Sequence, residues 1–315
     1  MAEIGGSGQV GLAFETTKGT YIAPTKWIPV RSESLQKIEE KQYRMNIRAL
    51  ADRTPGPQGN YRIEGDIEFE ITHDTILYFL YAARVLPAKT GVTDFTYTFT
   101  PVATANPTTA SGATTRKTLS ILVGRSNLGF GYTGLSVTGF SITFDNEVMV
   151  GTFSLMGLDE SLQSIGAQTW PTSDVYGPEE SEVKIPAATA RVDISSASLT
   201  VDDGGVADHR MDGSRAPSRI RWGEREVTFT AEHDFEDRDD YDIFTAQTQQ
   251  SLLVQGSRSA TNDQVKVTLA GTITDSYDVT LPGLGDLVSA NIGYHATYDG
   301  ADAYTVEVKS TEDIT

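Results

Sequence analysis

The stretch Gly139–Asp145 reads GFSITFD, and a similar stretch, GYHATYD, occupies Gly293–Asp299. In both stretches apolar residues alternate with polar or small ones, which is the period of two of a strand with one buried face. Each stretch is followed by a short turn and by a second alternating run, Val148–Leu155 or Tyr304–Val308. The pattern predicts two β-hairpins, one near the middle of the chain and one near its end.

Two further matches indicate that these hairpins belong to repeated units. Tyr61–Asp74 resembles Arg221–Asp234, which lies 160 positions later, and Ser32–Leu35 resembles Ser196–Leu199 at an offset of 164. Small loop insertions in a duplicated unit produce offsets that drift in this way. We therefore predict two tandem copies of one β-rich domain, with the same order of elements.

The predicted organisation is all-β with a minor α content. We place an N-terminal arm at residues 1–27, the first copy at 28–157, a linker at 158–190 and the second copy at 191–315. The arm is expected to be extended because glycine is frequent at its start. The linker is placed where prolines and a small acidic cluster interrupt the alternation.

Each copy is expected to contain a long hairpin and one flanking helix. In the first copy the hairpin runs from Leu35–Leu50 to Tyr61–Thr72 around the polar tip Asp52–Asn60. The helix covers Thr75–Val85, with Asp74 at its N-cap. The corresponding features of the second copy are a Gly- and Pro-containing tip around Asp212–Pro217 and a helix near Asp239–Gln249.

Composition restricts the function. The chain has 43 acidic and 25 basic residues, a net charge of −18, and no cysteine. A surface of this charge repels nucleic acid, so DNA could pass by it without specific binding. The acidity fits either adaptation to high salt or simple solubility. The absence of cysteine excludes disulfides and thiolate chemistry, and the absence of long apolar runs or signal-peptide features predicts a protein made in the cytoplasm, without a membrane span.

Candidate chemical motifs do not form a recognisable site. His73 and His233 are each followed by Asp. We favour a structural His–Asp contact over a metal site or an acid–base pair, because no third metal ligand and no nucleophile lies at a spacing typical of such sites. Glu232–Asp242 lacks the glycine and closing glutamate of a calcium loop. Gly6–Gly11 matches a dinucleotide fingerprint, but no strand precedes it. We expect no enzymatic activity, no cofactor and no metal site.

A series of short motifs runs through the first part of the chain. A glycine-rich start is followed by VGLAFETTKGT at Val10–Thr20, by Pro24-Thr25, by WIPV at Trp27–Val30 and by SESL at Ser32–Leu35. The series is clearest over residues 8–82 and resembles the N-terminal portion of tail tube proteins from long, non-contractile tailed viruses. The resemblance implies a β-sandwich or barrel domain with one flanking helix, a long hairpin, and arms that grip neighbouring rings.

The resemblance also implies a function. Such a protein polymerises as stacked rings into the virion tail tube, a conduit for genome delivery, after assembly in the host cytoplasm. Its partners are other copies of itself and the tape measure, tail terminator and distal tail proteins, and viral DNA passes through without specific binding. Six domains form a ring in this family, so two copies per chain predict a trimer with pseudo-sixfold symmetry. The acidic composition favours a virus of a halophilic archaeon.

The resemblance assigns contact roles to the hairpins and the arm. The residues expected to line the lumen or stack the rings are Tyr43, Arg44, Arg48, Asp52, Arg53, Tyr61, Arg62, Glu64, Asp66, Glu68, Glu70, Arg210, Asp212, Arg215, Arg219, Arg221, Glu224 and Glu226. The residues expected to bridge rings from the arm are Gly8, Val10, Leu12 and Phe14.

Two functions of other classes stay open from the sequence. A surface or carbohydrate-binding β-sandwich module would expose clustered aromatic residues, whereas Trp27, Trp170 and Trp222 are scattered along the chain. A hydrolase would need a cleft with convergent polar groups, and no Gly-x-Ser-x-Gly motif is present.

Overall fold

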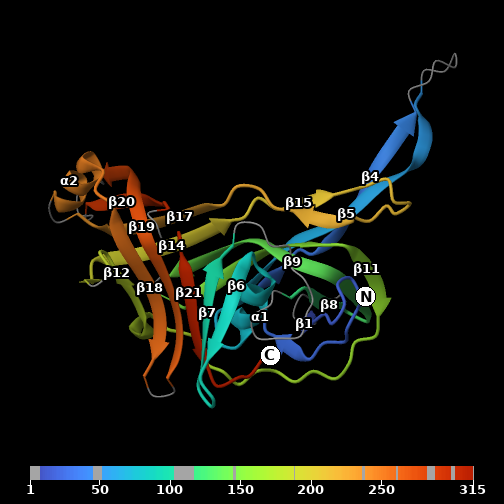
Figure 1. Cartoon of the computed structure of the whole chain (residues 1–315), viewed down its shortest axis with the longest axis horizontal. Helices are drawn as coiled ribbons and strands as arrows, with labels where there is room; N and C mark the ends of the chain where they lie inside the picture. The colour runs from blue at the N-terminus through green and yellow to red at the C-terminus, as the bar shows by residue number, and fades with distance from the viewer. Residues whose placement is uncertain are drawn as a thin grey trace.

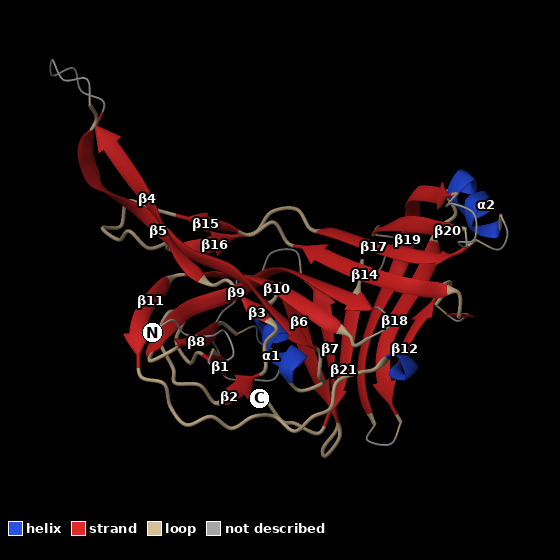
Figure 2. Cartoon of the chain, turned by 180° about the vertical axis from the view of Figure 1, so that it is seen from behind, coloured by secondary structure: helices blue, strands red, loops and turns tan. Residues whose placement is uncertain are grey.

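A computed structural model of the chain describes residues 8–44, 52–102, 117–144, 147–187, 189–235, 238–259, 262–281, 288–298 and 302–314. Strands dominate these residues, and a long two-stranded projection leaves the main body at one end (Figure 1). Within the described residues, two α-helices and one short 3-10 helix interrupt the strands (Figure 2). The prediction of an all-β fold with a minor α content is confirmed.

The described elements of the first half are strands of different lengths and one α-helix. They are β1 (Gln9–Phe14), β2 (Lys26–Ile28), β3 (Ser32–Glu33), β4 (Gln36–Arg44), β5 (Thr54–Glu70), α1 (Thr75–Ala82), β6 (Val85–Thr90), β7 (Phe95–Pro101), β8 (Leu119–Arg125), β9 (Leu128–Phe144), β10 (Val150–Gly157) and β11 (Asp159–Gln163).

The second half has a similar series. Its elements are η2 (Pro178–Glu180), β12 (Ser181–Lys184), β13 (Ala190–Arg191), β14 (Ile194–Asp202), β15 (Val206–Asp208), β16 (Arg219–Arg221), β17 (Glu226–Asp234), α2 (Asp239–Ala246), β18 (Gln250–Arg258), β19 (Asp263–Thr280), β20 (Ser289–Ala296) and β21 (Thr305–Ser310).

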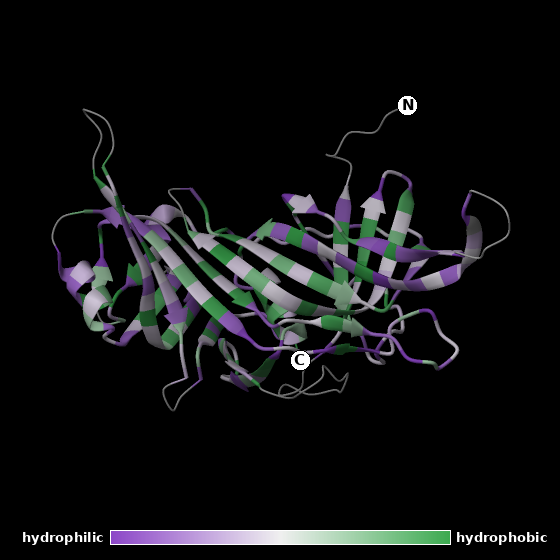
Figure 3. Cartoon of the chain, turned by 90° about the horizontal axis from the view of Figure 1, so that it is seen from above, coloured by the Kyte–Doolittle hydropathy of each residue, from purple (hydrophilic) through white to green (hydrophobic). Residues whose placement is uncertain are grey.

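One antiparallel sheet, which we call the central sheet, runs through both halves. Its strands lie in the order β4, β5, β10, β9, β14, β17, β20 and β19. The pairing of β9 with β14 joins the halves, with Phe144 opposite Ala197 and Gly139 opposite Asp202. Apolar and polar residues alternate along these strands, as the banded colouring shows (Figure 3). The short β3 adds to the same edge as β4, because it also pairs with β5.

A second layer of strands covers the apolar face of the central sheet. In the first half it contains β1, β2, β8, β11 and the first part of β9. In the second half it contains β12, β18, β21 and the first part of β19, extended by β7 and β6 from the first half.

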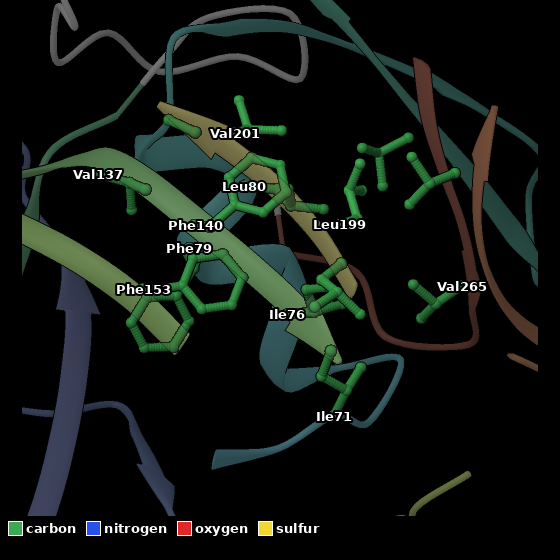
Figure 4. Packing of buried hydrophobic residues seen from close by; sticks show 14 of the residues in the cluster. Ile71, Ile76, Phe79, Leu80, Val137, Phe140, Phe153, Leu199, Val201 and Val265 are labelled. Carbon is green, nitrogen blue, oxygen red and sulfur yellow. The ribbon is translucent and has the colours of Figure 1, made fainter. Parts of the chain in front are cut away.

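The hydrophobic core lies between the layers and is shared by the two halves. Every residue of α1 is buried. Phe79 of α1 packs beside Phe153 of β10 and Phe140 of β9, and Leu199 of β14 lies in the same cluster (Figure 4). The helix is apolar all round, as a helix enclosed on every side must be. By contrast, α2 is rich in Asp and has no buried residue.

Strand pairing follows the same pattern in both halves. Ser32 lies opposite Glu68 in the first half, and Ser196 lies opposite Glu232, each 164 positions later. The bounds of α1 and α2 differ by the same 164 positions. The N-terminal part of β9 pairs with the preceding strand, β8, and its C-terminal part pairs with the following strand, β10. In the same way β19 pairs with β18 and then with β20. The register skips one residue in the pairing with the following strand, Thr138 in β9 and Asp275 in β19.

The predicted C-terminal hairpin is wrong. β20 and β21 do not pair with each other; β20 pairs with the C-terminal part of β19, and β21 pairs with its N-terminal part. In the repeated pairing pattern, β20 therefore takes the place of β10, not of β9. The physical reason is that a period of two identifies a strand and its buried face but not its partner. The first predicted hairpin, formed by β9 and β10, is confirmed.

The extended arm predicted at residues 1–27 differs from the structure after Gly8. Gln9–Phe14 forms β1, which pairs with β8 and β2, and the side chains of Val10 and Leu12 are 1% and 0% exposed. Residues 1–7 lie outside the described residues. The predicted linker also contains paired strands, β11 and β12. Asp74 precedes α1 but does not cap it, because its carboxylate accepts hydrogen bonds from Lys26 (2.7 Å) and Thr72 (2.6 Å).

Candidate functional site

The exposed face of the central sheet is mostly polar across its width. On β5, the side chains of Ile63, Ile67 and Phe69 are buried, whereas Glu64 and Glu68 belong to the opposite face because successive residues of a strand point in opposite directions. The same alternation holds on β9, β10, β14 and β17, so hydrophilic bands cross strand after strand (Figure 3). The two halves of the chain thus share one polar surface.

Rows of neighbouring residues cross this surface in register. One row contains Glu68, Thr152, Ser141, Thr200 and Thr228, on five adjacent strands. Hydroxyl side chains fill the middle of the surface, and carboxylates flank them. The acidic residues of the surface are Glu64, Asp66, Glu68, Glu70, Asp202, Glu226, Glu232, Asp234 and Asp278. We call this set of rows the acidic face.

Basic residues neutralise only part of the acidic face. Arg31 pairs with Glu70 at 3.1 Å, and Arg62 pairs with Glu64 at 2.5 Å. Within the described part of the chain, Asp66, Glu232 and Asp234 form no ion pair. The surface therefore presents a net negative potential, which repels a phosphate backbone.

The two long hairpins predicted from the sequence lie side by side. β4 pairs with β5, and the ribbon formed by β15 and β16 runs along them (Figure 1). Arg215 joins them: its Nε donates to the Gly59 carbonyl at 2.7 Å, and its Nη1 donates to Gln58 Oε1 at 2.7 Å. The Tyr61 amide donates to the Arg215 carbonyl at 3.1 Å. Burial, followed by a hydrogen bond to Asp159, raises the pKa of Tyr61 to about 12.

The structure divides the sequence-predicted residues into three groups. Arg62, Glu64, Asp66, Glu68, Glu70 and Glu226 lie on the acidic face. Tyr43, Arg44, Asp52, Arg53, Tyr61, Arg210, Asp212, Arg215, Arg219, Arg221 and Glu224 lie on or beside the two hairpins. Gly8, Val10, Leu12 and Phe14 lie at or within β1, and Arg48 is outside the described residues.

Sequence reasoning missed the serine and threonine rows at the middle of the acidic face. Ser141 and Thr143 alternate with buried Phe140 and Ile142, so the face of each strand was predictable. That these hydroxyls align with those of β14 depends on the pairing of β9 with β14, which no local pattern reveals.

A half-buried ionic cluster connects α2 to the segment that contains Arg191 and Asp193. Arg191 donates to Asp193 (2.6 Å) and to Asp240 (3.0 Å), and the buried His233 lies 3.3 Å from Asp193. His233 therefore contacts Asp193 and Asp240, and His73 contacts Asp263 at 3.6 Å. No group of ligands that could hold a metal ion occurs among the described residues. These contacts hold neighbouring strands and α2 together.

The ionic cluster around Arg191 is expected to make the stability of the fold sensitive to acid. The hydrogen bond from Arg191 lowers the pKa of Asp193 below its ordinary value of 3.8. A lowered native pKa contributes stability above the unfolded pKa, and this contribution is lost as the pH falls through the native pKa. We therefore expect the free energy of unfolding to fall below about pH 4. The Asp193→Asn variant should be less stable at neutral pH and should lose part of this dependence, as measured by urea denaturation at several pH values. Identical pH profiles for variant and wild type would contradict this role.

The tryptophans make no exposed aromatic cluster. Trp27 and Trp170, scattered in the sequence, come together with ring centroids 6.4 Å apart, but the side chain of Trp27 is buried. A binding platform for sugars needs several exposed rings, and this pair provides one. None of the described helices is long and apolar enough to cross a membrane.

Comparison with known proteins agrees with the geometry. Residues 5–304 match the sequence profile of a protein family described as phage tail tube protein. A search of curated proteins finds no match. The matched region contains the whole central sheet, both hairpins and both helices. The chain therefore belongs to the phage tail tube protein family, and it is a structural, non-enzymatic component of the virion tail.

Proposed function

We propose that the protein forms trimeric rings with pseudo-sixfold symmetry, which stack into the tail tube that conducts the genome to the host. The observation that carries this proposal is the repeated strand pairing at an offset of 164 positions within one continuous sheet. Two tandem copies of one unit per chain would supply two of six similar ring positions. Three chains then close a ring, because heterologous contacts between identical chains form a ring when their rotation closes.

In this proposal the acidic face lines the lumen. The opposite face of the central sheet is covered by the second layer and α1, so only the acidic face is available to a central channel. Carboxylates repel the phosphate backbone, and hydroxyl rows offer no fixed positive charge. DNA would slide through without specific binding.

The hairpin of β4 and β5, with its β15–β16 ribbon, is the proposed contact between rings, because it projects beyond the sheet (Figure 1). Val10 and Leu12 are buried within β1, so Gly8 and Phe14 are the residues of that segment proposed to contact the next ring. At the ends of the tube we propose contacts with the tape measure, tail terminator and distal tail proteins, made during assembly in the host cytoplasm. The net charge of −18 supports a host that lives in high salt.

Electron microscopy of the purified full-length chain at high salt tests the ring proposal. We expect hollow rings or tubes whose end-on averages show threefold symmetry with six similar lobes. A ring of six chains, established by mass measurement, would contradict the trimer. A chain that stays monomeric at high concentration in every salt condition would contradict ring formation altogether.

A hairpin-shortened variant tests stacking separately. Replacing residues 42–57 with a short turn removes the projecting part but leaves the paired base of β4 and β5. We expect rings that no longer stack. Tubes of normal length from this variant would assign stacking to another surface.

A further inference from the structure

We propose that rings close by strand pairing between the outer edge of β19 in one chain and the outer edge of β3 and β4 in the next. The proposed register copies the pairing of β9 with β14 inside each chain. This inference rests on the ring assembly proposed above and specifies which surfaces meet. The partner is a second copy of this chain.

The internal contact between the halves provides the template. β9 pairs with β10 on one side and with β14 on the other, and the β14 contact runs from Phe144–Ala197 to Gly139–Asp202. This contact joins the last strand of the first half's sheet to the first strand of the second half's sheet. A ring built from repeated units would use the same contact again between chains.

The equivalent edges are identified by the pairing pattern. β19 corresponds to β9, because the skipped residues Thr138 and Asp275 occupy the same place in the two pairings. β3 and β4 correspond to β14, because Ser32 and Ser196 face equivalent residues of β5 and β17. The strands that should meet are therefore residues 276–281 of one chain and residues 33–38 of the next.

Both edges lack a strand partner within the described residues. β18 pairs with β19 only as far as Thr272, and β21 pairs with it only between Gln264 and Thr268. Beyond these points β19 has β20 on one side and no described strand on the other. β3 and β4 pair only with β5 among the described strands. Open strand edges are sites where another chain adds.

The side chains on these edges differ from their internal equivalents in exposure. Val279 and Leu281 are 40% and 82% exposed. Their equivalents Ile142 and Phe144 are 0% and 7% exposed, because β14 lies against β9. An incoming strand in the same register would place Leu35 beside Val279 and cover this apolar edge. Burial of that surface favours association.

The two edges also suit a ring more than a symmetric dimer. β4 and β19 lie at opposite ends of the central sheet, so pairing them joins chains head to tail. Head-to-tail contacts close into rings or continue as filaments, whereas dimers use one surface twice. The acidic face would continue across the join, with Asp278 beside Gln36.

One contact modifies the expected ladder. The Leu35 carbonyl already accepts hydrogen bonds from Arg125 Nη2 (2.6 Å) and from the Tyr132 hydroxyl (3.0 Å). The new ladder would therefore lack that acceptor and depend on the backbone groups on either side of it.

Cysteine cross-linking tests the register, because the natural chain has no cysteine. Gln36 and Asp278 are both exposed, and their internal equivalents, Thr200 and Ser141, lie directly opposite each other. We expect the double variant Gln36→Cys, Asp278→Cys to form disulfides between chains when assembled rings are oxidised with copper phenanthroline. On a non-reducing gel the bonds should give covalent dimers and trimers that disappear with a reducing agent.

Two matched variants control the geometry. Ser141→Cys with Thr200→Cys should form the same bond within one chain, giving no covalent oligomer. Gln36→Cys with Val279→Cys shifts the register by one residue and places the side chains on opposite faces, so the correct pair should give at least about tenfold more covalent oligomer.

The outcomes separate the two proposals. Rings in the microscope, an internal 141–200 bond and no 36–278 bond would overturn the proposed edges while leaving ring formation intact. Equal cross-linking of the correct and shifted pairs would also overturn the register. Failure of the wild-type chain to form rings would contradict both proposals.

Discussion

Replacing Phe153 by alanine is expected to lower the free energy of unfolding by about 4 kcal/mol. The ring of Phe153 is 0% exposed, and its centroid lies 5.4 Å from that of Phe69, 4.9 Å from Phe79 and 5.5 Å from Phe140. The substitution leaves a cavity between α1 and the central sheet, because three rings lose a shared neighbour. Urea denaturation of the unassembled chain at fixed salt concentration measures the loss.

Two further variants show whether the cavity is the cause. Phe153→Leu keeps most of the volume and should cost less than half as much. Leu162→Ala removes an apolar side chain that is 70% exposed and should change stability little. A loss below about 1 kcal/mol for Phe153→Ala would mean that the aromatic cluster does not stabilise the fold.

Replacing Asp203 by alanine is expected to cost about 3 kcal/mol or more, because it removes the carboxylate of a buried ionic cluster. Asp203 is 1% exposed and accepts a hydrogen bond from Arg225 Nε at 2.6 Å, and Arg84 Nη1 lies 4.0 Å away. Arg225 also donates to the backbone carbonyls of Arg84 and Val102. The cluster thus connects residues next to α1 and β7 with residues next to β14 and β17.

The expected loss of stability depends on the burial of Asp203, so an exposed carboxylate provides the control. Asp66→Ala removes an exposed carboxylate from the acidic face and should leave stability nearly unchanged. Asp203→Asn should fall between the two, because the amide keeps an acceptor but loses the charge. Equal effects for Asp203→Ala and Asp66→Ala in urea denaturation would show that the cluster contributes nothing beyond net charge.

Local patterns were sufficient to predict individual elements. The alternation of Phe140, Ile142 and Phe144 with polar residues predicted β9 and its buried face. The two helices were predicted with the right first residues but each was predicted three residues too long at its C-terminus. Their different burial follows from composition, since α1 is apolar and α2 is acidic. The acidic residues of β5 were assigned to a contact surface by the family resemblance, and the alternation along the strand then places Glu64 and Glu68 on one face.

The pairing partner of each strand and the sequence offset between the two halves were harder to predict, because both depend on residues far apart in the sequence. The match of Ser32–Leu35 with Ser196–Leu199 has the 164-residue offset of the strand pairing. The match of Tyr61–Asp74 with Arg221–Asp234 has an offset of 160 and is shifted by four residues. A shift by an even number keeps every side chain on its own face, so the hydrophobic pattern could not detect it. The alternation alone could not reveal that β1 pairs with β8.

The pairing of β7 with β21 has a consequence for how the chain becomes folded during synthesis. Phe99 of β7 lies opposite Val306 of β21. During synthesis, β7 can therefore pair with β21 only after about 200 further residues have been made. Until then β7 has an open edge on a nascent chain. The ribosome must release the segment through β21 before the outer layer can close, and a product terminated before β21 keeps an edge prone to aggregation. Synthesis of β21 is therefore required before the first half loses its exposed strand edge.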